Sequence, residues 1–198
     1  MIVLSKQKVE SLLRVEEESG IWFGKIDLFV DAIGAVIPFV IDLKNESDCL
    51  THRTIQTINE VANLTEEHYD RIIRLLYEDA MLLKGEVDYG DPTPKPEIAP
   101  KNFIRRLFWR PDKYRFVRLE HDDKRHPMFG INTTNDIRVR IKWDAVCFSN
   151  SQESPKRIAF LTCYPEWEQE HGREIAVCNG VPAGISEIQL NEYEYQDY

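Results

Sequence analysis

The stretch from residue 137 to residue 181 constrains the fold most, because it reads as three consecutive strands. Apolar and charged residues alternate from residue 137 to residue 144. This period of two predicts a strand with one face in a core and the other in water. Residues 158–164 are apolar at nearly every position, which predicts a strand covered on both faces. Residues 173–180 are predicted to form the third strand, and a turn at residues 167–172 joins it to the second.

A hairpin is predicted ahead of this block, over residues 22–43. Two alternating segments flank a turn-like stretch at residues 31–34. Pro38 lacks a backbone N–H, so we expect the second strand of the hairpin to lie at a sheet edge or to contain a bulge. Residues 6–18 fit a short helix and a strand equally well, and both remain open. The apolar positions of the hairpin are Trp22, Ile26, Leu28, Val30, Ile37, Phe39, Ile41 and Leu43.

Two helices are predicted between the hairpin and the three-strand block. The first begins near Thr51, and the second begins after Thr65, which is a natural N-cap, and ends at Gly85. Each helix has one apolar face that needs a sheet to cover it. We therefore expect an α+β fold in which two helices pack on one face of a mainly antiparallel sheet.

The length of 198 residues and the 42% hydrophobic content fit one domain with one core. A proline-rich and basic segment at about residues 86–135 interrupts the regular pattern, and we interpret it as an insertion. Residues 187–198 alternate acids and tyrosines without helical periodicity, so we expect a loose acidic tail there.

The net charge of −9 argues against a general nucleic-acid-binding protein, because phosphates require a positive surface. The charge is uneven, since residues 101–118 hold seven basic residues and one acidic residue. No apolar run approaches the length of a membrane span, and residues 1–4 are too short for a signal peptide. We expect a cytoplasmic protein without a membrane contact.

Four cysteines occur without a CxxC pair or histidines at zinc-finger spacing. Three of them lie in strand patterns, so we expect buried thiols and predict no cofactor. The cysteines are Cys49, Cys147, Cys163 and Cys178.

Two groups of residues could carry chemistry. His121, Asp122, Asp123 and His126 could bind a divalent metal, although their spacing matches no standard site and a solvated loop explains them as well. His171 lies among Glu166, Glu168 and Glu170 and could act as a general base with an orienting carboxylate. The alternative for His171 is local hydrogen bonding in a turn that Trp167 anchors and Gly172 shapes.

The chain resembles a group of small, mostly uncharacterised bacterial domains on two short motifs. The first is the N-terminal strand with Trp22-Phe23-Gly24. The second is the hairpin with Trp167-Glu168-Gln169-Glu170-His171-Gly172, and two helices lie between the motifs. Members of this group are associated with immunity proteins that act beside polymorphic toxins. The resemblance implies a protein-binding role in the bacterial cytoplasm and supplies no catalytic residue.

We therefore expect a non-enzymatic protein that binds a protein partner, in particular a basic toxin domain, and neutralises it. Carboxylates can bind arginine and lysine, and tyrosines offer large contact areas. The residues expected to bind the partner are Glu166, Glu168, Glu170, His171, Glu192, Tyr193, Glu194 and Tyr195, with residues 101–118 as the next choice. The alternative is a hydrolase or other enzyme that uses His171 with a nearby glutamate, or a metal at His121 and His126.

Overall fold

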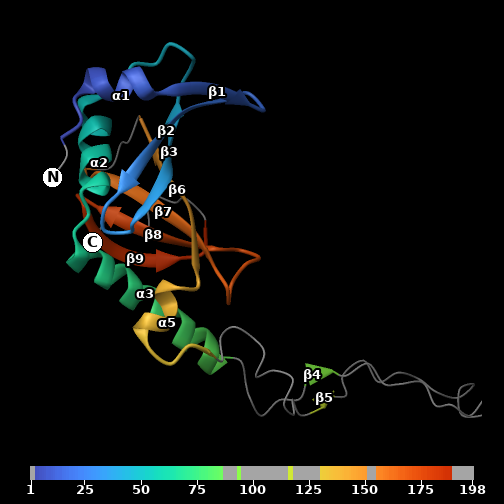
Figure 1. Ribbon diagram of the computed structural model, residues 1–198. Coiled ribbons are helices and arrows are strands. Elements are labelled where there is room, and N and C mark those ends of the chain that lie inside the picture. Colours follow the sequence, from blue (N-terminus) through green and yellow to red (C-terminus); the bar gives the residue numbers. More distant parts are fainter. Residues whose placement is uncertain (1–2, 87–92, 95–115, 118–129, 151–154, 189–198) are drawn as a thin grey trace, which may run out of the picture.

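The structure is a computed structural model that describes residues 3–86, 93–94, 116–117, 130–150 and 155–188 (Figure 1). Seven strands form one sheet in the order β1-β2-β3-β6-β7-β8-β9. Their bounds are β1 Arg14–Glu18, β2 Ile21–Val30, β3 Ala35–Leu43, β6 Ile141–Ser149, β7 Ile158–Pro165, β8 Arg173–Cys178 and β9 Val181–Ser186. A separate two-stranded sheet pairs β4 (Thr93–Pro94) with β5 (Phe116–Val117).

All neighbouring strands of the large sheet are antiparallel except β3 and β6, which are parallel. The chain passes through the helical segment between these two strands, as a parallel pair requires a long connection. The α+β class and the mainly antiparallel sheet are therefore confirmed.

The described part of the chain contains four helices where the sequence predicted two. They are α1 (Lys6–Leu12), α2 (His52–Ala62), α3 (Glu66–Glu86) and α5 (Thr134–Arg138). Both predicted starts are confirmed, because the Thr51 hydroxyl accepts from the Thr54 N–H at 3.1 Å and that of Thr65 from the His68 N–H at 3.3 Å. Helix α3 continues one residue past Gly85, its predicted end.

The strand predicted to begin at Ile137 begins at Ile141. The preceding residues form α5, where the Asp136 carboxylate accepts from the N–H groups of Asn132 and Thr133 at 2.9 and 2.8 Å. These bonds satisfy donors at the helix start that a strand would have paired differently. Ile137 is fully buried, but on a helix. The alternation therefore identified Ile137 as a core residue but not Val139, which is 81% exposed at the end of α5.

Residues 6–18, for which the sequence allowed either a helix or a strand, contain both, since α1 is followed by β1. The interpretation of Pro38 was wrong. Strand β3 lies between β2 and β6, and its pairing with β2 runs through Pro38 without a bulge. The parallel pairing with β6 begins only at Phe39, so Pro38 lies just beyond the β6 ladder, where no N–H has to be donated to it.

One hydrophobic core joins the helices to the sheet. Phe39 of β3, Ile58 of α2, Ile72 of α3, Leu161 of β7 and Ile175 of β8 are all nearly inaccessible to solvent and belong to the same cluster. Figure 1 shows α2 and α3 following one another along the sheet, with α3 beside β9 and β1 at the opposite end. Contacts between α3 and β9 agree with this view.

Most of the predicted insertion at about residues 86–135 and nearly all of the predicted tail at 187–198 lie outside the described residues. The single-domain interpretation and these two boundaries therefore stay predictions. None of the described helices is both long enough and apolar enough to cross a membrane.

Candidate protein interface

Along β2 and β3, buried side chains alternate with side chains that point away from the core. The second set forms a surface that we call the outer face. On this face Phe29 lies opposite Val36, and Asp27 lies opposite Pro38. Phe29 and Val36 are 52% and 63% exposed, although both are large apolar residues. Exposed apolar groups that lie together and are bordered by polar groups are typical of protein interaction sites.

The outer face continues into a hollow of about 440 Å³ where β3 meets β6 and β7. The pairing explains its position, since Val40 lies opposite Cys147, and Cys147 lies opposite Phe160. Ile21 and Phe23 of β2 form another side of the hollow. The walls are therefore mainly apolar, and the hollow is large enough to receive an apolar side chain from another molecule.

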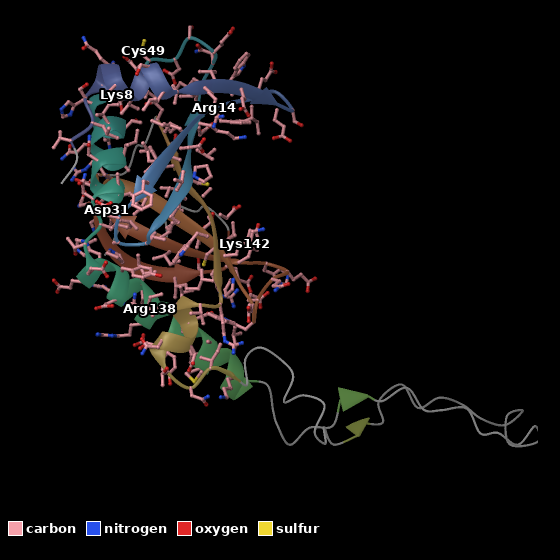
Figure 2. The ribbon with its side chains drawn as sticks, in the orientation of Figure 1. Lys8, Arg14, Asp31, Cys49, Arg138 and Lys142 are labelled. Carbon is pink, nitrogen blue, oxygen red and sulfur yellow. The ribbon has the colours of Figure 1, made fainter. Side chains whose placement is uncertain are left out.

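Carboxylates surround these apolar residues. Asp42 lines the hollow, Glu18 pairs with Ile21 across β1 and β2, and Asp31 lies in the turn next to β2. All three are exposed, and within the described ranges none forms an ion pair. Figure 2 shows Asp31 and Arg14 at opposite ends of this region.

The two basic residues of strands β1 to β3 already have partners. Arg14 binds Asp27 at 2.7 Å, and Lys25 binds Glu16 at 3.0 Å while its ammonium lies 4.8 Å from the centroid of the Phe23 ring. The remaining charge of the outer face is therefore negative, which favours a positively charged partner.

The turn at residues 166–172 has a different organisation from the outer face. Glu168 accepts from the His171 N–H at 3.3 Å and lies 3.1 Å from the Nδ1 atom of the His171 ring. The other oxygen of Glu168 lies 3.8 Å from Arg173, whose Nε donates to Asp79 of α3 at 2.9 Å. Arg173 is buried, so Glu168 helps to neutralise a cation that fastens β8 to α3.

The expected structural roles in this turn are present. Trp167 is 4% exposed and belongs to the main core. Gly172 has φ +67°, and a Cβ atom there would lie 2.7 Å from Ile188 and 3.0 Å from the Cys163 carbonyl oxygen. Only glycine fits this backbone without strain.

The expected partner-binding residues fall into three groups. Glu166 is paired with Arg140 at 3.1 Å, and Glu168 is engaged as described above, whereas Glu170 and His171 are exposed. Glu192, Tyr193, Glu194 and Tyr195 lie outside the described residues. The structure thus brings the first four together at one turn, and their role in partner binding stays a prediction.

The metal candidates His121, Asp122, Asp123 and His126 also lie outside the described residues, as do all but two residues of the basic stretch 101–118. Within the parts of the chain that are described, no three histidine, cysteine or acidic residues gather as metal ligands would.

All four cysteines are free thiols, but only Cys163 and Cys178 are buried, while Cys49 is exposed. Burial, with smaller contributions from Asp144 and Glu174, raises the pKa of Cys147 to about 11. Burial also raises the pKa of Cys163 to about 12. Cys147 is therefore a neutral, half-buried wall of the hollow near neutral pH.

Comparison with known proteins adds one observation. Residues 111–191 match a family described as a domain of unknown function, DUF6985. The match includes β6 to β9 and leaves out β1 to β3, α2 and α3. No curated protein and no solved structure matches the chain. Both strands of the outer face thus lie outside the matched segment.

Sequence reasoning missed the outer face, although its signal was present. The hairpin was interpreted through its core positions, and Phe29 and Val36 occupy the alternate positions where polar residues would be expected. Large apolar residues on the solvent-facing side of a strand are the sequence signal that predicts such a surface.

Proposed function

We propose that this chain is a non-enzymatic protein that binds another protein through the outer face of β2 and β3. The observations that support the proposal are the exposed pair Phe29 and Val36 at the turn end of the hairpin, the apolar hollow at its other end, and three carboxylates without ion pairs in the described residues. We further propose that α2 and α3 pack on one face of the sheet, which leaves the outer face available for a partner.

The more specific proposal is that the partner is a bacterial toxin and that binding neutralises it in the cytoplasm. Two features support it: the resemblance on the Trp22-Phe23-Gly24 and Trp167 to Gly172 motifs, and the acidic character of the chain. Toxins that act on nucleic acids need basic surfaces, and an acidic binder attracts them electrostatically. Apolar contacts would then hold the complex once it has formed.

The test starts from the gene that adjoins the gene for this chain. Its product should stop the growth of a bacterial host, and co-expression of this chain should restore growth. Val36→Glu should abolish the rescue, because it places a charge within the apolar contact. Val139→Glu is the matched control, since Val139 is 81% exposed and lies at the end of α5, away from the outer face.

Both variants should unfold at nearly the same temperature as the wild-type chain, which separates binding from folding. A harmless gene product, or one that stays toxic beside the wild-type chain, would contradict neutralisation. If the two valine variants rescue growth equally well, the outer face is not the binding surface.

An enzyme remains the second candidate because of the contact between Glu168 and His171. A carboxylate 3.1 Å from Nδ1 can orient the ring and leave Nε2 to act as a base. Against this proposal, Glu168 is also engaged with the buried Arg173. Loss of a measured turnover in His171→Ala, with unchanged thermal stability, would favour the enzyme over the binding protein.

A further inference from the structure

The large sheet has two edges, and they are protected to different degrees. At one edge, β9 contains Pro182, its pairing with β8 is irregular between Ala176 and Val177, and α3 lies beside it. Proline, an irregular ladder and a covering helix are all means of preventing a further strand from pairing.

The other edge, β1, has none of these features. Its five residues pair with β2 in an unbroken register, it contains no proline, and all five are exposed. In the described part of the chain, no strand pairs with the far side of β1. Figure 1 shows β1 at the end of the sheet opposite α3 and β9. Its outer backbone groups are therefore able to pair with an added strand.

The side chains of β1 restrict which strand can be added. Glu16, Glu17 and Glu18 follow one another, and Glu16 is already bound to Lys25. Glu17 and Glu18 have no ion pair within the described residues and point to opposite faces of the sheet. An added strand would therefore place two consecutive side chains opposite them, and basic side chains are the ones that stabilise such cross-strand pairs.

A second copy of this chain is a poor occupant for the edge. Pairing β1 with another β1 would gather six glutamates around two arginines, and Arg14 is already engaged with Asp27 at 2.7 Å. Like charges across a strand pair are destabilising, so β1 opposes self-association while it admits a basic strand.

We propose that the partner adds an extended segment to β1, with consecutive lysine or arginine residues opposite Glu17 and Glu18. This rests on the proposed protein-binding function and names the mode of recognition and the chemistry of the partner. The segment would continue the sheet beside the outer face, so the same partner can reach the hollow near Phe23. Main-chain bonds would supply part of the affinity, and the two glutamates would select basic sequences.

The test uses three synthetic peptides and the full chain, so it does not depend on the natural partner. The first peptide has two central lysines between valines and threonines, the second has glutamates in place of the lysines, and the third keeps the lysines but has prolines at the flanking positions. We expect only the first to slow hydrogen exchange of the β1 amides that do not bond to β2. The proline peptide has the same charge and cannot complete the ladder.

A double variant, Glu17→Lys with Glu18→Lys, should weaken binding of the lysine peptide by about 2- to 30-fold, the range for two lost cross-strand pairs, and should favour the glutamate peptide. The control is Glu46→Lys with Glu78→Lys, two exposed acids outside β1 and its neighbouring strands, which changes the net charge equally. Strand addition is wrong if the proline peptide binds as well as the first, if the control variant weakens binding as much, or if β1 is already protected in a dimer of the chain alone.

These outcomes are separable from those of the growth experiment. If Val36→Glu abolishes rescue and the double glutamate variant does not, protein binding stands and strand addition fails. If no toxin is neutralised but the lysine peptide still protects β1, the binding mode stands and the proposed function fails.

Discussion

Phe29 of β2 and Val36 of β3 lie directly opposite each other, and both side chains point into solvent. Such a pair contributes little to the stability of the folded chain, since each side chain is more than half exposed. We predict that Phe29→Ala changes the free energy of unfolding by no more than about 0.5–1 kcal/mol, measured by denaturant titration. Its binding of the partner should weaken by about 2 kcal/mol or more, as for an aromatic residue at the centre of an interface.

The matched control for this prediction is Leu82→Ala, because Leu82 is 69% exposed on α3 and distant in sequence from the hairpin. Equal losses of affinity in both variants, measured by calorimetry with the partner of the growth test, would show that Phe29 has no special role.

The ion pair between Arg157 and Glu60 ties the start of β7 to α2. The Nε of Arg157 donates to both oxygens of Glu60 at 3.0 Å, and Nη2 donates to Oε1 at 2.6 Å. The two side chains are 22% and 21% exposed, so solvent screens them only partly. Glu60→Gln should lower the free energy of unfolding by about 1.5–3 kcal/mol, the range for hydrogen bonds to charged groups.

Glu10→Gln provides the comparison for Glu60→Gln. Glu10 pairs with Lys6 at 3.5 Å, and both side chains are well exposed. Its loss should change stability by less than about 0.5 kcal/mol. If urea denaturation gave the same free energy of unfolding for both variants, the Arg157–Glu60 pair would not stabilise the fold more than an exposed pair does.

How far the sequence could predict this structure depended on whether a signal was local. The apolar stripe of α3 and the cap at Thr65 are fixed by neighbours along the chain, and both were predicted. The alternation at Ile137 was equally clear and gave the wrong element, because the bonds to Asp136 stabilise a helix there. The periodicity correctly indicated that Ile137 is buried, but the capping bonds set a helical backbone that leaves Val139 exposed.

The candidate site was less predictable, because its contacts join distant parts of the chain. The sequence placed Glu168 beside His171 but could not show that Arg173 also contacts Glu168 and reaches Asp79, which lies 94 positions away. The apolar hollow is lined by both Phe23 of β2 and Phe160 of β7, and two other strands lie between β2 and β7 in the sheet. No local pattern specifies that order of strands.

Gly172 provides a test of the turn that carries His171. Gly172→Ala combines two costs: the left-handed backbone at φ +67° and the close approach of the new methyl group to Ile188 and the Cys163 carbonyl. Gly20 has φ +82°, and a Cβ atom at this position would have no atom within 4 Å beyond those of Gly20 and its chain neighbours. Gly20→Ala therefore isolates the cost of the backbone conformation. We expect about 1–2 kcal/mol for Gly20→Ala and about 1–3 kcal/mol more for Gly172→Ala.

Chemical denaturation of the two glycine variants measures this difference. Equal destabilisation would mean that Ile188 and the β7 backbone at Cys163 move aside freely, and the turn would then be less firmly held than its contacts indicate.

Asp136 should give the stability of α5 a dependence on acid. Hydrogen bonds from Asn132 and Thr133 lower the pKa of its carboxyl group. A lowered pKa in the folded state stabilises the fold above the unfolded pKa of about 3.9, and this contribution is lost as the pH falls through the folded value. The difference in stability between the wild-type chain and Asp136→Asn should therefore be present at neutral pH and shrink in acid.

Asp48 has a pKa lowered by the backbone N–H of Lys44 and the side chain of Asn150, so both proteins retain some acid sensitivity from that site. Asp31→Asn is the control, because Asp31 is exposed in the β2–β3 turn. The free energy of unfolding of Asp31→Asn should differ from that of the wild-type chain by the same amount at every pH. If the difference for Asp136→Asn is also independent of pH, the charge of Asp136 does not stabilise α5.

The four thiols should react with a disulfide reagent in a fixed order that reports on the hollow. Cys49 is exposed and should react first, and Cys49→Ser should remove this fast phase. Cys147 should follow slowly at neutral pH, because a pKa of about 11 leaves little thiolate, and its rate should rise with pH as thiolate forms. A partner that fills the hollow should slow Cys147 further in the Cys49→Ser background. Unchanged labelling of Cys147 in a saturated complex, followed by mass spectrometry, would place the partner elsewhere on the chain.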